Sequence, residues 1–199
     1  MKYQLILFDY NGTLVNTPFK DGKPIHILKG VHEKLLELAI AGIKTGVCTN
    51  QAGPAWNMAT DKNTFPTVEM LANELRKIML LLPGIEPRPW YISLYDSRVM
   101  GMLKARYELE QLIAPEEVMQ QLQKAMHNVF GRAPYVHIGI DKDWRKPAPG
   151  MLTFAREQAK VEASETLYVG DLVDDATAAR AAGMHFAWAD EFFQRGEHS

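Results

Sequence analysis

The sequence predicts an α/β fold in which a central parallel sheet is covered by helices on both faces. Short apolar runs alternate with segments of helical periodicity, and this alternation favours a parallel sheet over an antiparallel one. A chain of 199 residues can form one domain with a sizeable core, or a core domain with a small insertion. We therefore expect one core and one insertion.

The first half of the chain contains three expected strands and two expected helices. Apolar runs predict strands at Gln4–Asp9, Lys44–Cys48 and Trp90–Tyr95. Apolar residues at helical spacing predict a helix over Gly30–Ala41, which Gly42 would end. Thr67 can cap a second helix that runs to about Leu82.

The alternation breaks between Ser97 and Phe130, where the composition is strongly helical. Pro115, followed by two glutamates, predicts that a new helix starts inside this segment. We therefore expect residues 1–96 and 135–199 to form the core, and residues 97–134 to form a helical insertion that could act as a cap.

The last third of the chain returns to the alternating pattern. Its expected elements are a strand at Tyr135–Ile140, a helix at Pro147–Lys160, and a closing strand, helix and strand at Thr166–Val169, Asp174–Ala182 and His185–Trp188. The tail from Glu191 to Ser199 is charged, and we expect it to fray.

The composition excludes several classes of protein. Twenty-two basic against 24 acidic residues give a net charge of −2, which does not indicate a nucleic-acid or membrane partner. The single cysteine, Cys48, cannot form an internal disulfide and leaves no cluster for structural zinc. No apolar stretch approaches bilayer length, and no signal-peptide core follows Met1. We expect a soluble, reduced, cytoplasmic protein, and the sequence does not predict its oligomeric state.

Polar residues follow several of the predicted strands. Asp9 ends the first strand and opens a glycine-containing turn, Thr49 and Asn50 follow the second strand, and Asp171, Asp174 and Asp175 follow the strand at Thr166–Val169. Ligands of parallel α/β sheets bind at the carboxyl ends of strands, so these side chains should meet at one edge.

These residue types suit phosphoryl chemistry. The Asp9 carboxylate could attack phosphorus and divide one difficult displacement into two easier ones. A divalent cation held between Asp9 and the later aspartates would remove their repulsion of a phosphate, and oxygen ligands suit Mg²⁺. Lys146 would balance the remaining charge, and Thr49 would bind phosphoryl oxygens.

Each residue also has a plainer interpretation. Asp9 could be a turn residue, the later aspartates could cap a helix, and Lys146 could lie on the surface. We expect Asp174 only to cap that helix or to face solvent. The cations of the insertion, such as Lys104 and Arg106, could form a lid over the strand ends or a solvated face paired with glutamates.

Taken together, the segments resemble the four motifs of the haloacid dehalogenase-like (HAD) superfamily, in the family's order along nearly the whole chain. The resemblance implies a HAD-like three-layer α/β/α sandwich and a Mg²⁺-dependent phosphomonoester hydrolase that acts on a small phosphorylated metabolite through an aspartyl-phosphate intermediate. It implies catalytic roles for Asp9, Asn11, Thr49 and Lys146, substrate binding by Thr49, Asn50, Arg145 and Lys146, and metal binding by Asp9, the backbone carbonyl of Asn11, Asp171 and Asp175.

Two segments indicate a branch of this superfamily. Cys48–Gly53 and Arg145–Leu152 look most like the branch of histidinol-phosphate phosphatase, heptose-bisphosphate phosphatase and the polynucleotide-kinase 3′-phosphatase domain. Some members of this branch carry a zinc loop before the lysine, and this chain lacks the cysteines for one. Arg132, Lys142 and Arg145 are the better substrate-binding candidates there, and Trp56 could either stack on a ligand or pack.

Asn11 departs from the family pattern, which places a second aspartate there to protonate the leaving oxygen and then activate water. An amide cannot exchange a proton near neutral pH, so general acid–base help of about 10²- to 10⁴-fold should be missing. Two alternatives therefore stay open: a catalytically impaired protein that binds a phosphate ligand, and a polynucleotide 3′-phosphatase. The net charge of −2 makes nucleic acid the less favoured partner.

Overall fold

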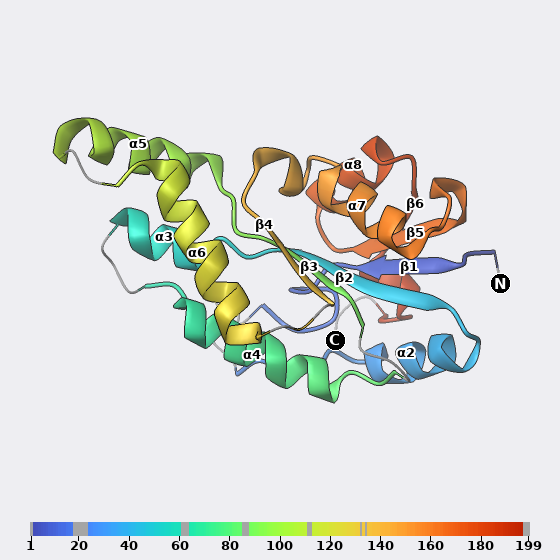
Figure 1. Ribbon diagram of the computed structural model, residues 1–199. Coiled ribbons are helices and arrows are strands. Elements are labelled where there is room, and N and C mark those ends of the chain that lie inside the picture. The colour runs from blue at the N-terminus through green and yellow to red at the C-terminus, as the bar shows by residue number, and fades with distance from the viewer. Residues whose placement is uncertain are drawn as a thin grey trace.

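A six-stranded parallel sheet forms the centre of the protein (Figure 1). The computed structural model describes residues 2–17, 24–60, 64–84, 88–110, 113–131, 133 and 135–196. Within these residues the strands are β1 (Leu5–Phe8), β2 (Lys44–Asn50), β3 (Trp90–Ser93), β4 (Val136–Gly139), β5 (Thr166–Gly170) and β6 (His185–Trp188). Every strand pairing in the sheet is parallel, so the predicted fold class is confirmed.

Strand β1 lies at the point of the sheet where the order of strand addition reverses. The order is β4-β3-β2-β1-β5-β6, so the chain moves outward through β2, β3 and β4 and then returns to the other side of β1. Phe8, the last residue of β1, lies in register with Val47 of β2 and Val169 of β5. The residues that follow β1 are therefore flanked by the carboxyl ends of two strands, where α/β sheets bind ligands.

Side chains alternate between the two faces of the sheet and form two cores. Ile6 and Phe8 pack into a core with α2 (Val31–Ile40), α4 (Val68–Leu81) and α6 (Pro115–Phe130). Leu5 and Leu7 point the other way, into a core with α7 (Gly150–Ala159) and α8 (Val173–Ala181). Figure 1 shows α7 and α8 on one side of the sheet and α2 and α4 on the other. Helices thus cover both faces, as the period-two pattern of a buried sheet requires.

Helices α5 (Ser97–Glu110) and α6 occupy the segment predicted as an insertion. They lie in the connection between β3 and β4. Helix α6 buries Val118, Leu122 and Met126 in the first core, so it covers part of the sheet. Helix α5 packs against α3 (Gly53–Thr60) and extends beyond the sheet in Figure 1. The role of this segment as a cap stays a prediction.

The structure corrects several expected boundaries. Helix α3 was not predicted, because Gly53 and Pro54 resemble a turn, although proline is well tolerated in the first turn of a helix. Helix α7 begins at Gly150 rather than at Pro147. Short 3₁₀ turns at Lys142–Trp144 and Ala163–Glu165 were also not predicted.

The expectation of a frayed tail was wrong for residues 191–196. Helix α9 (Ala189–Phe192) closes the chain, and buried Phe193 stacks on Phe8 with 5.9 Å between ring centroids. Arg195 donates to the backbone carbonyls of Thr13 at 2.6 Å and Lys29 at 3.0 Å. Residues 197–199 lie outside the described part of the chain. Among the described residues, no helix is both long and apolar enough to cross a membrane.

Candidate active site

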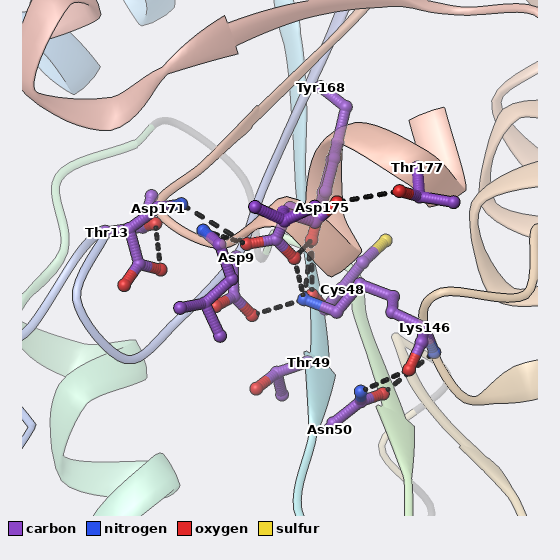
Figure 2. A network of polar contacts seen from close by, with 12 residues as sticks. Asp9, Thr13, Cys48, Thr49, Asn50, Lys146, Tyr168, Asp171, Asp175 and Thr177 are labelled. Carbon is purple, nitrogen blue, oxygen red and sulfur yellow. Dashed lines mark hydrogen bonds and ion pairs between the residues drawn. The ribbon is translucent and has the colours of Figure 1, made fainter. Parts of the chain in front are cut away.

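A buried lysine joins three polar groups at the carboxyl end of the sheet (Figure 2). The Lys146 side chain is 3% exposed, and its Nζ donates to Asp9 Oδ1 at 2.6 Å and to Asp175 Oδ1 at 2.7 Å. It also donates to the hydroxyl of Tyr168 at 2.7 Å. Two buried carboxylates therefore share one ammonium group, in a setting where charge-assisted hydrogen bonds are strong.

Asn50 holds the backbone of Lys146 in place. Its Nδ2 donates to the Lys146 carbonyl at 3.0 Å, and its Oδ1 accepts from the Lys146 amide at 3.2 Å. This paired contact joins the end of β2 to the loop before α7, as the two dashed lines near Asn50 in Figure 2 show. The Asn50 side chain, predicted to bind substrate, is thus engaged with the main chain of the lysine.

Asp171 lies in the turn between β5 and α8, and Asp175 lies in the first turn of α8. Asp175 Oδ2 accepts from the backbone amides of Asp171 at 3.2 Å and Leu172 at 3.0 Å, which fixes the first turn of α8. Asp171 Oδ1 accepts from the hydroxyl of Thr13 at 3.3 Å, so the turn after β5 is tied to the loop after β1. Asp174 is exposed at the start of α8, which confirms the expectation that it faces solvent.

Gly12 allows these two loops to approach each other. Its φ of +78° is a left-handed conformation that side chains other than glycine rarely adopt. A Cβ atom at this position would lie 2.1 Å from Asp171 Oδ2. The glycine of the predicted turn is therefore required both by its backbone conformation and by its contact with Asp171.

Asp9, Asp171 and Asp175 form a group that fits a divalent cation. One carboxylate oxygen from each lies within 4.8 Å of the other two. Hard cations such as Mg²⁺ prefer such oxygen donors and complete their coordination with water. The set consists only of carboxylates, and no described histidine or cysteine joins it, which disfavours softer metals such as zinc. These residues would hold the ion predicted from the sequence.

Burial and crowded negative charge perturb the acids of this site. Burial raises the pKa of Asp9 to about 7, with Lys146 acting in the opposite direction and Asp175 adding to the rise. Burial also raises the pKa of Asp171, and Asp175 contributes to that rise. For Lys146, burial would lower the pKa, but Asp9 and Asp175 outweigh it and the net shift is upward. One ammonium does not balance three close carboxyl groups, so a cation bound here would relieve their repulsion.

A second group of predicted residues lies around an adjacent pocket of about 220 Å³. Asn11, Asn50 and Arg145 line it, together with Trp56 and Phe65, whose ring centroids are 5.9 Å apart. Thr49 is buried nearby in β2 and accepts a hydrogen bond from Gln51 Nε2 at 3.0 Å. Lys142 lies in the 3₁₀ turn before Arg145, and Arg132 lies outside the described residues. Asn11 and Asn50 thus connect this pocket to the loops that carry Asp9 and Lys146.

Three polar residues of the site were not predicted from the sequence. Tyr168 receives a hydrogen bond from Lys146 and donates to the Cys48 carbonyl at 3.0 Å. Thr13 contacts Asp171, and Asp96 lies beside Arg145 at the pocket. Asp96 directly follows the strand expected at Trp90–Tyr95, so its position at a strand end was a usable signal. Nothing in the sequence distinguishes Tyr168 from other aromatic residues of a buried strand.

The fold and the site together define a parallel α/β protein with an acidic, lysine-containing centre at the carboxyl ends of its strands. The family described as haloacid dehalogenase-like hydrolase matches residues 114–189, which include Lys146, Asp171 and Asp175. The match supports the HAD-like resemblance over this part of the chain. The segment before residue 114, with Asp9 and Thr49, lies outside the matched region.

Solved structures provide the second comparison. An uncharacterized protein from Listeria monocytogenes serotype 4b superposes with a TM-score of 0.51 at 15% identity, over 93% of this chain and 77% of that one. This likeness concerns the fold. A D,D-heptose 1,7-bisphosphate phosphatase from B. bronchiseptica, complexed with magnesium and phosphate, has a TM-score of 0.49 at 17% identity, over 98% of this chain and 88% of that one. No curated protein matches the chain in sequence.

Proposed function

We propose that this protein is a Mg²⁺-dependent phosphomonoester hydrolase that acts on a small phosphorylated metabolite through an aspartyl-phosphate on Asp9. The observation that carries the proposal is the shared contact of buried Lys146 with Asp9 and Asp175, beside the three-carboxylate group. A buried nucleophile with a perturbed pKa, a fixed cation and a metal-binding set are the parts that such a reaction needs. The match to a hydrolase family supports the same conclusion.

In the first step, one Asp9 oxygen attacks phosphorus, and the bond between phosphorus and the alcohol oxygen breaks. The alcohol leaves with the bonding electron pair, and the phosphoryl group is transferred to Asp9. In the second step, water attacks the phosphorus of the aspartyl-phosphate, which releases inorganic phosphate and regenerates the carboxylate. Lys146 remains protonated, because the pKa of its ammonium is raised, and its charge stabilises the phosphoryl oxygens in both steps.

Asp171, in the turn after β5, and Asp175, in α8, have supporting roles in this proposal. Asp171 and Asp175 would hold Mg²⁺ with Asp9, while the contact of Asp175 with two backbone amides keeps the set in place. When bound, Mg²⁺ would supply positive charge that offsets the repulsion between the carboxylates and a phosphate dianion. The backbone carbonyl of Asn11 is the remaining proposed ligand, and Thr49 and Arg145 are proposed to contact substrate.

Asn11 limits the rate in this scheme. The alcohol needs a proton as it leaves, and the attacking water must lose one, but an amide can do neither. Both steps therefore depend on solvent water for proton transfer. We expect Asn11→Asp to raise turnover by about 10²- to 10⁴-fold.

The direct test is Mg²⁺-dependent phosphate release from a panel of phosphomonoesters, run on this protein and on the Asn11→Asp variant. Turnover by both, lost on addition of EDTA and in an Asp9→Asn control, would support the proposal. Turnover by Asn11→Asp alone would support a phosphatase that residue 11 impairs. No release from either protein would refute the phosphatase.

A second candidate is a protein that binds a phosphate ligand without turning it over. Asn11 is the observation that favours it, because the groups proposed to bind a ligand do not depend on a proton carrier at residue 11. This candidate predicts that inorganic phosphate and Mg²⁺ bind together in calorimetry while both proteins release no phosphate from any substrate. A polynucleotide 3′-phosphatase would instead prefer a 3′-phosphorylated oligonucleotide, at rates that fall with salt.

A further inference from the structure

The pocket beside Asp9 can receive the part of a substrate that leaves as the alcohol. Asn11 and Asn50 line it, and these residues belong to the loop after Asp9 and to the end of β2, next to Lys146. Its volume of about 220 Å³ corresponds to about seven water molecules in the liquid, at about 30 Å³ each. This space suits a small polar leaving group.

Two guanidinium groups meet one buried carboxylate at this pocket. The Asp96 side chain is 3% exposed, and its Oδ2 lies 3.1 Å from Arg145 Nη2 and 3.2 Å from Arg98 Nη2. Asp96 Oδ1 also accepts from the backbone amide of Arg98 at 2.9 Å, at the start of α5. All three residues line the pocket, so this side of it carries one positive charge in excess.

The two arginines are held in place by neutral contacts as well. Arg145 Nη1 donates to the Tyr95 carbonyl at 2.8 Å. The Arg98 guanidinium lies over the Trp56 ring at 5.1 Å from its centroid, and its side chain is 73% exposed. Arg98 is held by Asp96 but remains open to solvent. Its other N–H groups can therefore donate to a ligand without breaking the contact with Asp96.

The other acid that lines the pocket is not paired with the two arginines among the described residues. Glu74 reaches the pocket from α4 and accepts a hydrogen bond from the Tyr10 hydroxyl at 3.4 Å. Burial raises the pKa of Glu74, which disfavours its charged form, although Tyr10 opposes that shift. Glu74 has no ion-pair contact with Arg98 or Arg145 among the described residues.

We propose that the substrate carries a second anionic group, a carboxylate or a phosphoryl group, which Arg98 and Arg145 bind in this pocket. The inference rests on the proposed phosphatase function and names its substrate class: phosphomonoesters of an acidic alcohol rather than of a neutral one. Arginine suits this role because its planar donors match a carboxylate or phosphate in pairs. Asp96 is the positioning residue that aims both side chains.

Binding, measured without turnover, provides the test. In the Asp9→Asn variant with Mg²⁺, calorimetry gives dissociation constants for three compounds: glycerol 3-phosphate, 3-phosphoglycerate and propane-1,3-diol bisphosphate. The first two differ only in a hydroxymethyl group against a carboxylate. We expect at least one of the two compounds with a second anionic group to bind about tenfold more tightly than glycerol 3-phosphate, the lower range for a hydrogen bond to a charged group. Which of the two binds more tightly identifies the second anion.

An Arg98→Gln change, made in the same background, should remove that preference and leave the affinity for glycerol 3-phosphate unchanged. The variant should stay folded, because Asp96 keeps Arg145 and the backbone amide of residue 98. Lys104→Gln is the matched control, since Lys104 is another exposed cation of α5, 4.0 Å from Glu108, and does not line the pocket.

Equal affinity for all three compounds, a preference that survives Arg98→Gln, or no binding of any of them would overturn the inference. These results are distinct from failure of the proposed function, which is read as absence of phosphate release from the wild-type and Asn11→Asp proteins.

Discussion

Replacing Asp9 with asparagine should stabilise the metal-free protein above neutral pH. The pKa of Asp9 rises to about 7 in the folded state, from an ordinary value of 3.8, with burial as the main cause. The folded state therefore binds this proton more tightly than the unfolded state. The stabilisation that this proton provides is complete below about pH 4 and is lost as the pH rises through about 7.

The magnitude follows from the size of the shift. A shift of about three pKa units, at about 1.4 kcal/mol per unit, amounts to roughly 4 kcal/mol. The free energy of unfolding decreases by this amount when Asp9 ionises in the folded protein. Asparagine has nearly the same shape and cannot ionise. In EDTA near pH 8, Asp9→Asn should therefore be more stable than the wild type by about 4 kcal/mol, and the difference should shrink as the pH falls towards about 4.

Urea unfolding in EDTA across this pH range measures the difference. Asp174→Asn is the matched control, because Asp174 is an exposed aspartate at the start of α8 and should change stability by no more than about 0.5 kcal/mol. Added Mg²⁺ should stabilise the wild type and close the gap to Asp9→Asn. A lower stability of Asp9→Asn near pH 8 in EDTA would refute the reasoning, since the Asp9 charge would then be a net stabiliser of the fold.

Three further predictions concern the loop after Asp9 and the proposed metal site. Arg195→Gln should lower the free energy of unfolding by about 1 to 3 kcal/mol, measured in urea, because the carbonyls of Thr13 and Lys29 lose their donor; unchanged stability would contradict this account. Gly12→Ala should lower the free energy of unfolding by at least about 1 to 2 kcal/mol, because alanine disfavours the left-handed backbone at this position. The added Cβ should also displace Asp171 and weaken Mg²⁺ binding about tenfold in calorimetry. Unchanged Mg²⁺ affinity of the variant would contradict this expectation. The affinity for Mg²⁺ should increase between about pH 6 and pH 8, with proton release detectable in buffers of different ionisation enthalpy, because Asp9 must ionise to bind; an affinity independent of pH would argue against Asp9 as a ligand.

Much of the core fold was predictable because its strands are short, apolar and separated by helices. The six expected strands all occur, with ends that differ by at most two residues. The order of the strands was not predictable, because it depends on which side of β1 each crossover takes. The final segment was mispredicted for a different reason. Its composition is mostly charged, but it also contains Phe192 and Phe193, which both pack against Phe8 and hold the segment in place.

The site was predictable where it depends on the ends of strands, and less so where it depends on contacts across the sheet. Asp9, Asp171 and Asp175 were expected to meet at one edge, and their oxygens do lie close together. The role of Asn50 was harder to foresee, since a contact with the Lys146 backbone joins residues 96 positions apart. The role of Tyr168 was the hardest to predict, because a buried aromatic residue of β5 is expected only to pack. Its hydroxyl has a polar role because Lys146, from a distant segment of the chain, donates to it.

Residue 11 belongs both to the loop of Asp9 and to the pocket proposed for a second anion. The groups proposed to bind the phosphoryl group and Mg²⁺ come mainly from elsewhere in the chain: Lys146 from the loop before α7, Asp171 from the turn after β5, and Asp175 from α8. An asparagine at residue 11 should therefore leave ligand binding intact while it slows proton transfer. An aspartate there would restore a proton carrier, but it would also place a negative charge on the wall that Arg145 shares. Asn11→Asp should thus raise turnover and, for substrates with a second anion, also raise KM, because the same carboxylate that transfers the proton repels the leaving group.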